Sequence, residues 1–118
     1  MNNKQPMPRT RSRRLDQVYG AIASPTRRAI LTALAGGEVN VGRLARRFPV
    51  SFNAVSKHVK VLERAGLVSR RVRGREHWLR LRAEPLREAA RWLARQRVFW
   101  DARLDALEVL LRDDAGGR

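Results

Sequence analysis

The sequence of 118 residues contains no cysteine, and this absence excludes several kinds of site at once. Without thiols the chain cannot form disulfides, bind metals through thiolates or sense redox conditions through cysteine. It has only two histidines, no GxSxG or Walker-type glycine loop, and no acidic pair in an apolar pattern. Asp101, Asp105 and Glu108 share a helix face without a histidine, which favours a solvated acidic strip over a metal site. We therefore predict that the chain is not an enzyme and has no metal site and no cofactor.

The sequence also lacks long apolar runs. Runs such as Val109–Leu111 are far too short to cross a bilayer, and the N-terminus is polar where a signal peptide would be apolar. A hydrophobic content of 43% is nevertheless enough for the core of one compact domain. We expect a cytoplasmic protein that makes no contact with membranes.

Positive charge is abundant and unevenly distributed. Residues 1–82 carry the whole net charge of +15, because they contain 19 Lys/Arg and 4 Asp/Glu. Residues 83–118 contain 7 Lys/Arg and 7 Asp/Glu and are neutral. Clustered cations favour phosphates through Coulomb attraction and counterion release. An arginine-rich solvated surface is the alternative explanation, since net charge says little about fold.

Two short helical patterns with a tight break between them follow a pair of N-terminal helices. Asn40 is placed to cap the first pattern, which Pro49 ends, and Ser51 is placed to cap the second, which Gly66 ends. Apolar residues recur at helical spacing in the second pattern, at Val55, Val59 and Leu62. Two helices joined by about three residues predict a helix-turn-helix.

From Leu67 the period changes from helical to alternating. The alternation runs out to Val72, turns at Arg73-Gly74-Arg75 and returns through Leu81, which predicts a β-hairpin with arginines at its tip. A bare hairpin is marginal in water, so we expect it to pack on the helices as the wing of a winged helix.

A long helix is predicted after Pro85. Its apolar stripe is longer than a small core can cover, so the surplus surface should meet a second copy in a two-fold dimer. The alternative is a helix that packs along its own domain. The predicted fold is mainly α with a small β-hairpin, a winged helix-turn-helix that forms a homodimer through its N- and C-terminal helices. The expected dimer contacts are Leu15, Val18, Tyr19, Leu93, Trp100, Leu104, Leu107 and Leu111.

Four segments are therefore expected. They are a disordered basic tail at 1–14, a DNA-binding region at 15–82, a dimerisation helix at 83–112 and a flexible tail at 113–118.

The polar face of the helix after Ser51 is the predicted recognition surface for double-stranded DNA. An α-helix fits the major groove, where amides, hydroxyls and amines can hydrogen-bond base edges. The expected DNA contacts of this helix are Ser51, Asn53, Ser56, Lys57, His58, Lys60 and Arg64. Those of the wing are Arg70, Arg71, Arg73 and Arg75.

Three stretches, ASPTRRAILTAL, VSFNAVSKHVKVLERAGLVSRRVRGREHWLRL and EPLREAARWLARQRVFWDARLDALEVLL, together resemble the ArsR/SmtB winged-helix repressors. The resemblance covers about residues 15–111 and looks like the metal-independent branch. It implies a homodimer joined through its first and last helices that binds a palindromic operator and represses its own operon. Many metal sensors of this family have a cysteine pair where this sequence has residues 41–45, VGRLA, and its last helix has no histidine. Metal sensing is therefore unsupported, and the sequence does not identify an effector.

Other classes of function also fit parts of the pattern. Charge alone would suit a non-specific nucleic-acid-binding protein, either architectural or RNA-associated. The long helix alone would suit a protein-interaction module. Because the wing, the recognition helix and the dimer helix occur together, they favour a sequence-specific transcription regulator.

Overall fold

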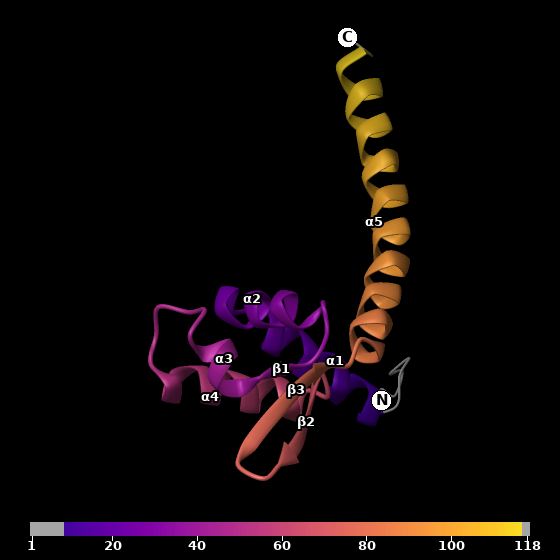
Figure 1. Ribbon diagram of the computed structural model, residues 1–118. Helices are drawn as coiled ribbons and strands as arrows, with labels where there is room; N and C mark the ends of the chain where they lie inside the picture. The colour runs from indigo at the N-terminus through magenta and orange to yellow at the C-terminus, as the bar shows by residue number, and fades with distance from the viewer. Residues whose placement is uncertain (1–8, 117–118) are drawn as a thin grey trace. The chain divides into compact units, whose positions relative to one another are not determined.

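The computed structural model describes residues 9–116, with side chains described from Arg13 to Asp113. The chain divides into two compact units, the first ending at Glu88 and the second beginning at Ala89 (Figure 1). The first unit contains four helices, a small sheet and the first residues of a fifth, long helix. The rest of that long helix forms the second unit.

The helices of the first unit begin at residues that suit helix starts. They are α1 (Arg9–Ile22), α2 (Pro25–Leu34), α3 (Val41–Ala45) and α4 (Phe52–Arg64). Ser24 caps α2 by accepting a hydrogen bond from the Arg27 N–H, and Pro25 follows at the first helical position. The side chain of Asn40 caps α3 by accepting from the Gly42 and Arg43 N–H groups.

Helix α1 begins earlier than the sequence pattern predicts. We expected residues 1–14 to form a disordered tail, but residues 9–14 are the first turns of α1. The segment has no glycine or proline and is rich in arginine, a good helix former, and Arg14 lies 3.1 Å from Glu88 in an ion pair. Periodicity misses this part because it contributes no apolar residues. The rest of the predicted tail, residues 1–8, lies outside the described residues.

The sheet has three antiparallel strands in the order β1-β3-β2. Strands β2 (Val68–Arg73) and β3 (Glu76–Leu81) form the predicted hairpin, in which Arg73 pairs with Glu76 across a loop of Gly74 and Arg75. Gly74 has φ +58°, the positive value that a type II′ turn requires at its first central position. Strand β1 (Val39–Asn40) was not expected, because two residues are too few to show alternation.

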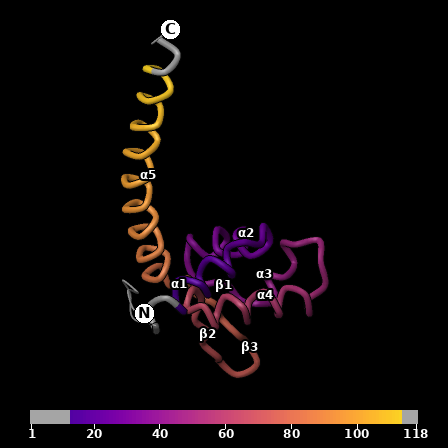
Figure 2. Tube along the Cα trace, turned by 180° about the vertical axis from the view of Figure 1, so that it is seen from behind, coloured from indigo at the N-terminus to yellow at the C-terminus, as the bar shows by residue number. Residues whose placement is uncertain are grey.

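The core of the first unit is made by apolar residues of every helix and of β3. Helix α4 packs against α2, α3 and β2. Figures 1 and 2 show these elements of the first unit from opposite sides. The largest fully buried side chains are Val18, Ile30, Leu34, Leu44, Val55, Val59, Leu62, Leu67 and Leu79. The predicted architecture, mainly helical with a wing, is confirmed.

Helix α5 (Glu84–Gly116) has 33 residues, a length of about 50 Å. It includes residues 113–116, which we expected to belong to a flexible tail; residues 117–118 lie outside the described part. Within the described range, no helix is both long enough and apolar enough to cross a membrane.

Candidate nucleic-acid interface

Helix α4 is fixed in place by its apolar side and by its two ends. Val55, Val59 and Leu62 are each 0% exposed. The Ser51 hydroxyl accepts a hydrogen bond of 3.1 Å from the Ala54 N–H, which caps the first turn. At the other end Gly66 takes φ +77°, a conformation that favours glycine, and turns the chain into β2. The buried side therefore determines which residues of α4 face solvent.

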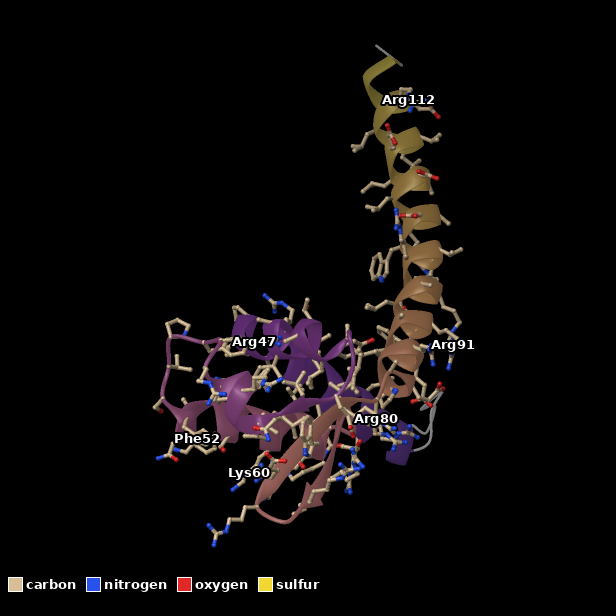
Figure 3. The ribbon with its side chains drawn as sticks, viewed as in Figure 1. Arg47, Phe52, Lys60, Arg80, Arg91 and Arg112 are labelled. Atoms are coloured by element: carbon tan, nitrogen blue, oxygen red, sulfur yellow. The ribbon has the colours of Figure 1, made fainter. Side chains whose placement is uncertain are left out.

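The opposite side of α4 carries mainly polar and basic side chains. Asn53, Lys57, Lys60 and Arg64 are exposed, as predicted for the recognition surface. Ser56 and His58 are half-buried because they lie on the two flanks of the helix. Figure 3 shows Lys60 on α4, and the hairpin of β2 and β3 extends on the same side of the first unit. The exposed cations of α4 and of the wing therefore lie on the same side of the first unit.

Arg70 joins the wing to α4 and is therefore not a free cation. Its Nε and Nη2 donate to the two carboxylate oxygens of Glu63 at 3.0 and 2.8 Å. Its Nη1 lies 3.0 Å from Nδ1 of His77, which must accept because a guanidinium can only donate. The hydrogen bond with Glu63 raises the pKa of Arg70 above its ordinary value, although burial opposes it. Sequence reasoning assigned Arg70 to DNA, whereas the structure places it between two elements of the protein.

The other wing arginines are more accessible. Arg71 donates to Glu38 at 2.7 Å, with half of its side-chain surface exposed. Arg73 and Arg75 at the tip are exposed, as expected of residues that approach a phosphate backbone.

Arg27 of α2 is a residue that sequence reasoning missed. Its Nε and Nη2 donate to the carbonyl oxygens of Ala21 and Gly20 at 2.6 and 3.0 Å, at the C-terminal end of α1. Its Nη1 lies 3.2 Å from Nδ1 of His58, so Nδ1 is an acceptor and the ring proton sits on Nε2. Arg27 thus ties α1 to the recognition helix. An arginine after a helix start carries no sequence signal of this role, because the partners of its guanidinium lie on two other elements, α1 and α4.

A groove of about 460 Å³ separates the start of α4 from the wing. Its lining comes from β1 and α3, from the first two turns of α4, and from the hairpin of β2 and β3 with its loop. The lining residues are Asn40, Val41, Gly42, Phe52, Ser56, Arg70, Arg75, Glu76 and His77. Phe52, which lines this groove, has no hydrogen-bonding group or charge, so the polar pattern of α4 did not predict it as part of the site.

The residues predicted for the dimer interface fall into two groups. In α1, Leu15 and Val18 are buried, at 8% and 2% exposure, and Tyr19 is half-buried, which raises the pKa of its hydroxyl. In α5 the predicted residues are all exposed, at 51% to 63% of their surface. They are Leu93, Trp100, Leu104, Leu107 and Leu111. In the single chain, only the α5 group offers a large apolar surface to a partner.

Among the described residues, no three His, Asp or Glu side chains lie close enough together to hold a metal ion.

Two consecutive helices, α3 and α4, pack against each other, and the outer face of α4 is polar. The hairpin of β2 and β3 follows them, and this combination defines the winged helix-turn-helix class. In agreement, residues 22–71 match the family model of a helix-turn-helix domain. The transcriptional repressor SdpR of Bacillus subtilis is 32% identical over 79 residues, which are 67% of this chain and 88% of SdpR. The HTH-type transcriptional regulator Rv2034 of Mycobacterium tuberculosis is 52% identical over 59 residues, which are 50% of this chain and only 55% of Rv2034.

Solved structures give the family. An ArsR-like transcriptional regulator from Rhodococcus sp. RHA1 has a TM-score of 0.71 and 36% identity, covering 84% of this chain and 93% of that one. A crystal structure of an ArsR family transcriptional regulator has a TM-score of 0.72 and 32% identity, covering 76% of this chain and 93% of that one. The chain belongs to the ArsR family of DNA-binding transcriptional regulators, and the resemblance seen in the sequence is confirmed.

Proposed function

We propose that the protein is a dimeric, sequence-specific repressor that binds a palindromic operator and represses its own operon. One observation carries this proposal: α4 is buried on one side, while its other side presents Asn53, Lys57, Lys60 and Arg64 to solvent. The name of its relative SdpR, a transcriptional repressor, favours repression over activation. An operator-binding protein shares a compartment with its DNA, so we also propose that it acts in the cytoplasm.

In this proposal the N-terminal half of α4 reads bases and the remainder contacts the backbone. Asn53, Ser56 and Lys57 can hydrogen-bond base edges in the major groove. Lys60 and Arg64 lie further along the helix and contact phosphates. The first turn of α4, which Ser51 caps, is the positive end of the helix dipole and attracts a phosphate.

The wing supplies contacts that do not depend on sequence. Arg71, Arg73 and Arg75 meet phosphates and the edge of the minor groove. Arg70 has a different role, because its bonds with Glu63 and His77 hold the wing at a set position beside α4. His58 presents its Nε2–H to the DNA, since Arg27 occupies its Nδ1.

The dimer is proposed to form through the apolar stripe of α5. Leu93, Trp100, Leu104, Leu107 and Leu111 recur at spacings of three, four and seven residues along the helix. Pairing two copies through this stripe would give a two-fold molecule with two recognition helices, the number that a palindromic operator with two half-sites requires. Because Leu15 and Val18 are buried in each chain, α5 is the principal contact.

Binding to the promoter of the protein's own gene tests this proposal directly. We expect affinity to fall steeply as salt rises, and a preference over random duplex of about 10³-fold or more. Fluorescence anisotropy with labelled duplexes at several salt concentrations measures both. Equal affinity for every duplex would indicate an architectural protein instead, and tighter binding of structured RNA would indicate an RNA-associated one.

A pair of substitutions distinguishes recognition of the base sequence from electrostatic attraction to the DNA backbone. Lys57→Ala should lower the preference for operator over random duplex by about tenfold, the loss of one base contact. Arg73→Ala removes the same charge from the wing and should weaken both duplexes about equally. Equal behaviour of the two variants would contradict the assignment of α4 as the reading element.

A further inference from the structure

Phe52, the first residue of α4, is an exposed aromatic side chain on a basic and polar surface. It is 54% exposed. Within residues 13–88 the exposed large hydrophobic side chains are confined to Val50, Phe52 and Val72. Val50 and Phe52 flank the Ser51 cap, and Val72 lies on β2 of the wing. Within residues 13–88 the exposed large apolar side chains therefore lie at or just before the start of α4 and on the wing.

The position of Phe52 brings it to the side of α4 that faces the wing. It lies one helical turn before Ser56, and both residues line the groove between α4 and the hairpin. Figure 3 shows Phe52 and Lys60 along the same edge of the first unit. The start of a recognition helix is the part that reaches base edges in helix-turn-helix proteins.

The chemistry of Phe52 restricts what it can recognise. A phenyl ring has no donor or acceptor and cannot read the hydrogen-bonding pattern of a base pair. Of the four bases, thymine alone presents an apolar group in the major groove, its C5-methyl, and the partner of that group is an apolar side chain. We propose that Phe52 reads the C5-methyl of one thymine in each operator half-site, a specificity contact that rests on the proposed operator-binding function.

The magnitude follows from the burial of a single methyl group. Burying one such group contributes about 0.8 kcal/mol, which corresponds to about fourfold in affinity. A dimer that reads two half-sites would gain about fifteenfold from both thymines together. This is smaller than the effect of a bidentate base contact but well within the range of a binding assay.

Deoxyuridine tests the proposal, because it lacks only the methyl group of thymine and keeps every hydrogen-bonding group. Each thymine of the mapped operator is replaced in turn, and the affinity of the full-length dimer is measured. We expect one position per half-site to lose about fourfold. Phe52→Ala should bind thymine and deoxyuridine operators equally, and its thermal unfolding should match that of the native protein because Phe52 is exposed.

Val72→Ala is the matched control, since it also removes an exposed apolar side chain from the same surface. It should keep the native ratio of thymine to deoxyuridine affinities. An operator whose every thymine tolerates deoxyuridine would overturn the proposal. So would a methyl preference that survives in Phe52→Ala and disappears only in Val50→Ala. No sequence preference at all would overturn the regulator function itself, and this contact with it.

Discussion

The large apolar side chains are mostly buried in the first unit and mostly exposed in the remainder of α5. Val55, Val59 and Leu62 of α4 are 0% exposed, whereas Leu104 and Leu111 of α5 are 57% and 63% exposed. The charge differs as well, because the excess of Lys/Arg lies entirely in residues 1–82. The first unit has a buried apolar core and an excess of positive charge, so we expect it to be stable by itself and to bind a polyanion. A long helix without a core of its own is marginal in water, so we expect α5 to be stabilised by the second chain of the proposed dimer.

Two leucine substitutions test this contrast most strongly. Leu62→Ala empties a fully buried position and should lower the free energy of unfolding by about 2–5 kcal/mol. Leu104→Ala changes the same atoms on an exposed stripe and should cost the isolated chain no more than about 0.5 kcal/mol. It should instead weaken dimerisation, so Leu104→Ala should become monomeric at protein concentrations at which the native protein is still a dimer.

Chemical denaturation at several protein concentrations distinguishes the two outcomes. If Leu104→Ala destabilised the chain as much as Leu62→Ala at concentrations where the protein is monomeric, α5 would be packed on its own chain. The contrast between the two regions would then be wrong.

A charge in the middle of the α5 stripe should break the link between dimerisation and DNA binding. Trp100→Glu places a carboxylate where two copies are proposed to meet, and a buried unpaired charge costs several kcal/mol. We expect a monomer in sedimentation and a loss of operator affinity of about 100-fold, since half-sites no longer bind together. Ala102→Glu adds the same charge half a helix turn away from the stripe and should remain dimeric. A Trp100→Glu monomer with full operator affinity would contradict the proposal.

Much of the fold could be predicted because local signals and the overall pattern agree. Ser24, Asn40 and Ser51 are all helix caps as expected, and Gly66 and Gly74 take positive φ where a helix ends and a hairpin turns. These are effects of single residues on their own backbone, which a sequence carries directly. Strand β1 and the first turns of α1 were missed, because the first depends on a distant strand and the second has no apolar residue.

The site was harder to predict than the fold. Exposure of Asn53, Lys57 and Lys60 follows from the burial of the opposite side of α4, so periodicity sufficed. The roles of Arg27 and Arg70 depend on partners 31 and 7 residues away, respectively, and no local pattern distinguishes a paired arginine from a free one. Conversely, Leu15 and Val18 have the pattern of a dimer stripe but lie inside the first unit.

The smallest expected effect concerns the joint between α4 and the wing. Glu63→Gln should weaken the two charge-assisted hydrogen bonds between Glu63 and Arg70 and lower the free energy of unfolding by about 1 kcal/mol. The substitution also removes a negative charge beside the DNA, which by itself would raise affinity. Glu38→Gln is the matched control, because it makes the same charge change at the more exposed pair with Arg71.

Relative to Glu38→Gln, we expect Glu63→Gln to bind the operator a few-fold more weakly, since a freer wing must be ordered again on binding. Anisotropy titrations of both variants at equal salt measure this ratio. Arg70 also contacts His77 on β3, so the loss of its bonds with Glu63 weakens the attachment of both hairpin strands to the recognition helix, and the packing of α4 against β2 remains. Equal affinities of the two variants would show that the wing holds its position without Glu63, and that Arg70 serves stability alone.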